Sequence, residues 1–117
     1  MGYESQVIFW VHKSVVGRLL TVTNQNKEAF NMLFQYANLE KDGSGNMKFS
    51  FDSIKWYESY EWVTAIGDFM SDLEREDLEY EFGFHRLGEE MGDYEQRGLS
   101  ELYEAHPTQS LECYSYG

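Results

Sequence analysis

The pattern of apolar, polar and turn-forming residues predicts β-strands in four stretches of the chain. Residues 5–12 are rich in β-branched and aromatic side chains, as in a buried strand. Residues 47–57 begin with alternating apolar positions, and residues 78–86 alternate over their whole length. A glycine-bounded turn at 88–93 leads into a further strand around 94–97. In the third stretch, Leu78, Tyr80, Phe82 and Phe84 are predicted to face one way, and Glu79, Glu81 and His85 the other.

Apolar positions spaced three and four residues apart predict two helices. The first helix follows the N-cap candidates Thr23 and Asn24 and ends before the turn-forming residues 42–46. The second helix runs from about residue 58 to residue 73. Residues 17–22 fit a short strand or a turn of helix equally well. The apolar faces are formed by Phe30, Leu33, Phe34 and Ala37 in the first helix and by Trp62, Ile66, Phe69 and Leu73 in the second.

This order of elements predicts the α+β class, with about two helices packed on one face of a mainly antiparallel sheet. The 117 residues are expected to form a single domain, residues 1–117. An apolar fraction of 42% and an aromatic fraction of 17% are those of a folded domain rather than a disordered chain. Residues 111–116 are a candidate for an edge strand.

Charge divides the chain into two unlike halves. Residues 1–57 carry six Lys/Arg and five Asp/Glu, whereas residues 58–117 carry three Arg and sixteen Asp/Glu. The net charge of −12 therefore comes from the second half. Concentrated negative charge favours a positively charged partner. It opposes direct binding of nucleic acid, because affinity for phosphates comes mostly from Lys and Arg.

The cysteine content and the N-terminal sequence predict a cytoplasmic protein. Cys113 is the single cysteine, so an intrachain disulfide is excluded and a reducing compartment is favoured. The first residues lack the basic region and long apolar run of a signal peptide. The large net charge favours a monomer.

Carboxylates of the second half recur at the spacings of the predicted helix and strands. Glu58 and Glu61, or Asp68 and Asp72, are three or four residues apart and would be neighbours on a helix. Carboxylates held in this way can imitate the regular charge of a phosphate backbone. Seven of the nine tyrosines lie in residues 57–117, and exposed Tyr among charges is common in protein interfaces. The residues predicted to bind a partner are Glu58, Glu61, Asp68, Asp72, Glu74, Glu76, Asp77, Glu79, Glu81, Glu89, Glu90, Asp93 and Glu95.

Metal and catalytic sites are less well supported by the sequence. The loop that begins at Asp42 resembles the start of an EF-hand, but Met47 and Ser53 stand where the loop requires Gly and Glu, so we interpret it as a turn. No cofactor is implied. The remaining candidate is a mixed metal site or small enzyme site at His85, whose nearby carboxylates are Glu89, Glu90 and Asp93. A solvated polar hairpin explains the same residues, and we predict that the protein is not an enzyme.

In size, net charge and charge layout, the chain resembles the small acidic DNA-mimic proteins of bacteria and phages. Members of this class occupy the DNA-binding face of another protein, such as the nucleoid protein HU or a defence nuclease. The resemblance rests on composition and implies a basic DNA-binding protein as the partner, with no direct contact to nucleic acid or membrane. The alternatives are an acidic interaction or immunity-type module whose partner does not bind DNA, and the small enzyme that would use His85.

Overall fold

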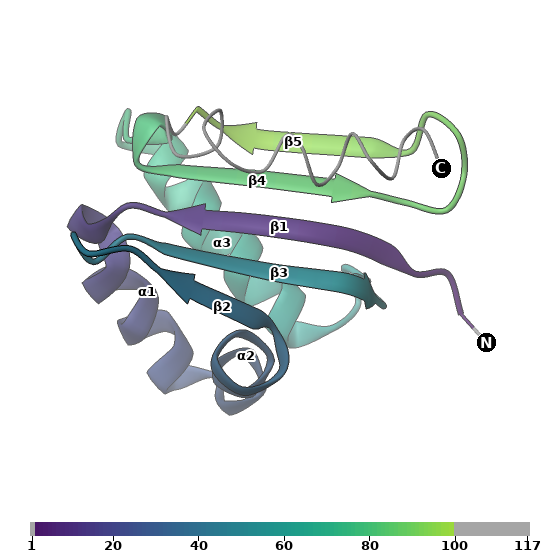
Figure 1. The fold of residues 1–117 in the computed structure, drawn as a ribbon, viewed down its shortest axis with the longest axis horizontal. Coiled ribbons are helices and arrows are strands. Elements are labelled where there is room, and N and C mark those ends of the chain that lie inside the picture. Colours follow the sequence, from purple (N-terminus) through teal and green to yellow (C-terminus); the bar gives the residue numbers. More distant parts are fainter. Residues whose placement is uncertain (1, 100–117) are drawn as a thin grey trace.

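The structure is a computed structural model that describes residues 2–99, and its central feature is a five-stranded antiparallel sheet (Figure 1). The strands are β1 (Ser5–Val11), β2 (Asn38–Lys41), β3 (Met47–Ile54), β4 (Phe82–Leu87) and β5 (Tyr94–Gly98), in the order β2-β3-β1-β4-β5. Every neighbouring pair runs antiparallel, so β1 lies at the centre between β3 and β4. The predicted α+β class is confirmed.

The helices of the described residues lie behind the sheet in Figure 1. They are α1 (Lys13–Gln25), α2 (Lys27–Asn31), which continues as a π-helix over Met32–Tyr36, and α3 (Glu61–Arg75). The side chain of Asn26 accepts a hydrogen bond from the Ala29 amide and caps α2, which separates it from α1. None of the described helices combines the length and the apolar character needed to cross a membrane.

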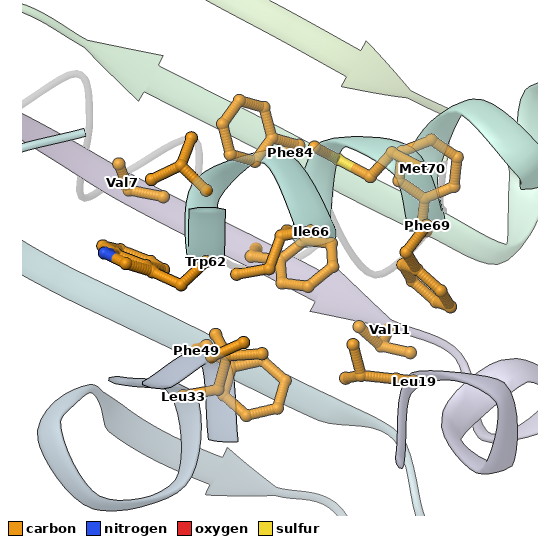
Figure 2. Close-up of a cluster of buried hydrophobic side chains, with 14 of the residues drawn as sticks. Val7, Val11, Leu19, Leu33, Phe49, Trp62, Ile66, Phe69, Met70 and Phe84 are labelled. Carbon is orange, nitrogen blue, oxygen red and sulfur yellow. The ribbon is translucent and has the colours of Figure 1, made fainter. Parts of the chain in front are cut away.

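The main core lies between the sheet and these helices (Figure 2). Phe9 on the central strand contacts Phe49 on β3, Phe84 on β4 and Phe69 on α3, with ring centroids 5.9, 6.3 and 6.2 Å away. Leu19 of α1 belongs to the same cluster. Because strand side chains alternate, the odd-numbered residues of β1 enter this core and the even-numbered ones point to the opposite face.

Several predicted boundaries differ from the structure. Residues 17–22 belong to α1, which begins where the side chain of His12 accepts a hydrogen bond from the Ser14 amide. The second helix begins at Glu61 rather than residue 58, because residues 57–60 form a turn before it. Strand β2 was not predicted. The candidate edge strand at 111–116 lies outside the described residues.

The predicted strand 78–86 is shorter than its alternation indicates. Asp77 adopts a positive φ of 60° at the end of α3, and the Leu78 amide then donates to the Leu73 carbonyl at 2.8 Å. This closure reverses the chain, so Glu79–Glu81 forms a 3-10 turn and β4 begins only at Phe82. Tyr80, which was predicted to share a face with Phe82 and Phe84, is 62% exposed, whereas both phenylalanines are fully buried.

The Asp42 loop is the turn between β2 and β3. The carboxylate of Asp42 accepts hydrogen bonds from the amides of Ser44 and Asn46 at 2.8 and 3.0 Å, and from the side-chain amide of Asn46 at 2.7 Å. These bonds lower the pKa of Asp42. The carboxylate therefore closes the turn, which agrees with our interpretation of the sequence.

Candidate functional site

A groove of about 610 Å³ lies between α3 and the hairpin of β4 and β5. Its apolar lining comes from Trp56, Val63, Met70 and Phe84. Its charged lining consists of Glu58, Asp68, Asp93, Glu95, Arg86 and Arg97. The groove therefore brings together four of the predicted carboxylates, Glu58 and Asp68 from the α3 segment and Asp93 and Glu95 from the hairpin.

Strand alternation explains why the hairpin presents these charges to α3. In the register of β4 and β5, Arg97 pairs with Phe84, and Glu95 pairs with Arg86. Phe84 points into the main core, so Arg86, Glu95 and Arg97 point to the same helix-bearing face.

Arg86 holds the base of the hairpin together. Its guanidinium lies 2.8 Å from an oxygen of Asp93 and 3.2 Å from an oxygen of Glu95, and it donates to the Ser5 hydroxyl at 3.1 Å. The hydroxyl of Tyr3 donates to Asp93 at 2.5 Å. The guanidinium, followed by the Tyr3 hydrogen bond, lowers the pKa of Asp93 to about 2, so Asp93 is ionised at neutral pH. The N-terminal segment is thereby tied to the hairpin turn.

Arg97 joins the hairpin to α3. Its guanidinium lies 2.8 Å from a carboxylate oxygen of Glu74 and donates to the Ser71 hydroxyl at 3.0 Å. Of these two partners, Ser71 also lines the groove. Arg97 therefore joins the two walls of the groove, whereas Arg86 pairs with carboxylates of the hairpin alone.

Other predicted acids have partners away from the groove. Glu76 accepts two hydrogen bonds from Arg18 of α1, at 2.9 and 2.7 Å, which lower the pKa of Glu76. Asp72 pairs with Arg75 on the surface of α3. Glu81 contacts Ser14 and His12 at the start of α1. Glu89 accepts a hydrogen bond from the Glu4 amide at 2.5 Å.

The remaining predicted acids have no ion pair or side-chain hydrogen bond within residues 2–99. Glu58 and Asp68 line the groove, Glu61 lies in the first turn of α3, and Glu90 lies in the hairpin turn. Asp77 follows α3, and Glu79 lies in the 3-10 turn. The predicted spacing of Glu79 and Glu81 along a strand is therefore wrong, because both precede β4. Glu58 likewise precedes α3 instead of lying on it.

His85 is separated from the carboxylates with which it was grouped as a possible metal or enzyme site. It lies on the face of the sheet opposite the helices, and its ring contacts Tyr94 with centroids 5.2 Å apart. Burial lowers the pKa of His85 to about 4, so the imidazole is neutral at pH 7. Asp93 instead bonds with Arg86 on the helix-bearing face. Within residues 2–99, no three His, Cys, Asp or Glu side chains are placed to hold a metal ion.

Sequence reasoning missed the cations and the aromatic residue that shape the groove. Arg86 continues the alternation of Phe82 and Phe84, so its position facing α3 was readable from the strand pattern. Trp56 lies after β3, and its ring packs against Phe84 with centroids 5.4 Å apart. No local pattern of residues marks it as part of a groove.

No family model, curated protein or solved structure matches the chain.

Proposed function

We propose that this protein is a cytoplasmic monomer that binds the DNA-binding face of a basic protein and competes there with DNA. The observation that carries the proposal is the convergence of carboxylates from the α3 segment and from the β4–β5 hairpin on one groove. Residues 58–99 carry thirteen Asp/Glu against three Arg, so this side of the molecule has a strongly negative field.

The groove suits the side chains that a DNA-binding surface presents. Lys and Arg have apolar stems and charged heads, and they prefer sites that offer apolar contact beside opposite charge. The partly exposed Trp56 provides the apolar contact, and Glu58 and Asp68 provide carboxylates with no ion pair inside the described residues. A guanidinium that reaches the face of an indole gains about 0.5–1 kcal/mol from the cation–π interaction at a solvent-accessible site.

The arginines already present support this interpretation. Arg86 and Arg97 are fixed by carboxylates and hold the groove walls in place, whereas Glu58 and Asp68 remain available to a partner's cations. A prearranged acidic surface binds with a smaller entropic penalty than an acidic tail, because its side chains need less ordering. No metal or cofactor takes part in this function.

The first experiment identifies the partner and tests the competition. The immobilised full-length protein is incubated with a cell lysate, eluted with a salt gradient, and the eluted proteins are identified by mass spectrometry. We expect a basic DNA-binding protein that is released by added duplex DNA and by about 0.5 M salt, where the Debye length is only a few ångströms. Retention of the partner in excess duplex DNA would instead support the module whose partner does not bind DNA.

The second experiment locates the contact with variants matched in charge. The double variant Glu58→Gln/Asp68→Asn removes two groove carboxylates, and Glu28→Gln/Asp52→Asn removes two exposed carboxylates from the near-neutral half. We expect the groove variant to weaken binding of the captured partner about tenfold, which is about 1.4 kcal/mol, and the control to change it less than twofold. Equal weakening by both variants would show that net charge alone drives binding and would contradict the groove as its site.

A further inference from the structure

A second pocket, of about 320 Å³, lies where α2 and its π-helical continuation meet the end of β3 and the start of α3. Its volume falls within the usual range for small-molecule sites, about 300–1,000 Å³. Among residues 2–99, no residue that lines this pocket also lines the groove described above, so the two sites are separate. We call it the tyrosine pocket, and the lining residues that matter here are Glu4, Glu28, Met32, Tyr36, Lys55 and Tyr60.

The π-helix brings Tyr36 to the edge of the tyrosine pocket. The Ala37 amide donates to the Met32 carbonyl at 2.9 Å, whereas an α-helix would use the Leu33 carbonyl. Such π-helical turns are rare and are often found at functional sites. The Tyr36 ring packs on Phe51, with centroids 6.4 Å and planes 35° apart, and the tyrosine is nevertheless 66% exposed. One face of the ring is therefore supported by the core while much of the ring stays open to the pocket and to solvent.

Tyr60 forms a second aromatic wall from a different element. It precedes the first turn of α3, is 37% exposed and packs on Tyr57, with ring centroids 5.1 Å apart. Tyr36 and Tyr60 are thus each held by another aromatic ring of the chain. A ligand that contacts them pays little to order them, because the chain has already fixed their positions.

The charges of the lining favour a cation. The tyrosine pocket offers the carboxylates of Glu4 and Glu28 against the single ammonium of Lys55. The Glu4 carboxylate accepts a hydrogen bond from the Ser53 hydroxyl, whereas the exposed Glu28 has no ion pair or side-chain hydrogen bond within residues 2–99. The faces of aromatic rings are negative and attract cations as well.

We propose that the tyrosine pocket binds a small molecule that carries a quaternary ammonium group. A bare metal ion is disfavoured, because no three His, Cys, Asp or Glu side chains of residues 2–99 are placed to hold one. The methyl groups of a quaternary ammonium instead make apolar contacts with aromatic faces and Met32, and its charge is attracted by the rings and by Glu28. Aromatic side chains are the usual receptors for this group.

Choline tests the proposal together with its uncharged carbon analogue, in which a tert-butyl group replaces the trimethylammonium group. Each compound is titrated into isotope-labelled full-length protein at constant ionic strength, and the NMR signals of Met32, Tyr36 and Tyr60 are followed. We expect choline to bind with a Kd below about 10 mM and the analogue about tenfold more weakly, the loss expected for two cation–π contacts. Absence of choline binding in this range, equal affinities, or shifts that centre on Gly67 and Asp68 of the groove would overturn the proposal.

Tyrosine variants locate the contact. Tyr36→Leu is expected to weaken choline binding about threefold, and Tyr36→Phe to change it less than about twofold, because the aromatic face remains. The matched control is Tyr80→Leu, which removes an equally exposed tyrosine outside the pocket and is expected to leave the Kd unchanged. Unchanged affinity in Tyr36→Leu, or an equal loss in Tyr80→Leu, would contradict the proposed site.

The two carboxylate variants described above separate this site from the groove, since each removes two negative charges. Glu28→Gln/Asp52→Asn is expected to weaken choline binding at least about twofold and to spare the captured partner. Glu58→Gln/Asp68→Asn is expected to do the reverse. Equal weakening of choline binding by both variants would show attraction by net charge alone and would overturn the tyrosine pocket, while leaving the proposed function of the groove to its own test.

Discussion

The two faces of the sheet start from the same central strand, yet they create opposite electrostatic surroundings. On the helix-bearing face, Phe9 lies in the apolar core. At the hairpin, the same face carries the ion pairs of Arg86 with Asp93 and Glu95. On the other face, Trp10 lies beside His85, with ring centroids 6.5 Å apart, and burial keeps His85 neutral.

Consecutive residues of β4 show what this difference teaches. His85 is held uncharged while Arg86 is held charged, because strand alternation sends them to opposite faces. A carboxylate that is near a strand residue in the sequence is therefore a poor guide to the charge of that residue. The charge is set by the surroundings on the face of the sheet to which the side chain points.

The largest expected effects come from substitutions of two neighbouring residues of β1 that point to opposite faces of the sheet. Phe9→Ala is expected to lower the free energy of unfolding by about 3–5 kcal/mol, since it leaves a cavity among the rings of the main core. Ile8→Ala is expected to lower it by about 2–3 kcal/mol, because Ile8 is also buried. Urea unfolding followed by circular dichroism measures both. A loss below about 0.5 kcal/mol for Ile8→Ala, a value typical of surface positions, would show that the second face is loosely packed.

The pH dependence of stability tests whether His85 is neutral in the folded protein. The pKa of His85 is about 4 in the folded protein and about 6.5 in the unfolded chain, so the unfolded chain takes up the proton first as the pH falls. The stabilisation is complete above pH 6.5 and is lost between pH 6.5 and about 4, by up to about 3 kcal/mol. Urea unfolding across this range should show a smaller loss in His85→Gln. The same pH dependence in both proteins would contradict a buried neutral imidazole.

Removal of Arg86 tests the charged side. Arg86→Met leaves Asp93 and Glu95 without their cation in a partly buried setting, and we expect a loss of about 2 kcal/mol in unfolding free energy. The matched control is Arg75→Met, which breaks the exposed pair with Asp72 and is expected to change stability by less than about 0.5 kcal/mol. Similar losses for the two variants would mean that the hairpin network is no stronger than an ordinary surface pair.

Acid titration of Asp93 gives the smallest expected effect. Arg86 and Tyr3 lower the pKa of Asp93 to about 2 in the folded protein, from about 3.8 in the unfolded chain. Its stabilisation is therefore present above about pH 4 and is lost as the pH falls through 2. Because other carboxylates titrate in the same range, the quantity to compare is the difference in unfolding free energy between the unchanged protein and Asp93→Asn. A difference that does not shrink between pH 5 and pH 2 would contradict this assignment.

The sequence predicted the elements whose buried side chains form a clear pattern along the chain. The apolar face of α3, the continuous apolar run of β1 and the alternation in β3 correspond to buried positions, so these patterns were visible in the sequence. Strand β2 was missed because its four residues, Asn-Leu-Glu-Lys, lie at an edge and only Leu39 joins the core. Helix α1 was left open because its run of Val, Gly and Thr residues is weak in helix propensity, and packing decides its conformation.

The acidic composition of the candidate site was predictable, but its pattern of pairing was not. The bonds from Arg18 to Glu76 and from Arg97 to Glu74 join elements that are far apart in sequence. Only the tertiary fold determines which carboxylates such cations neutralise. The turn at Asp77 had the same effect on Glu79 and Glu81, because a single left-handed residue removed both from the strand.

The central position of β1 has a consequence for synthesis of the protein in the cell. Its neighbour β4 is translated about 75 residues later, which takes roughly 4–15 s at the usual ribosomal rate of about 5–20 residues per second. Until then, the segment Val-Ile-Phe-Trp-Val has a free hydrogen-bonding edge and high β-propensity. The nascent chain therefore exposes an aggregation-prone stretch until β4 is made, and a chaperone that binds short apolar segments would be expected to bind it during that interval.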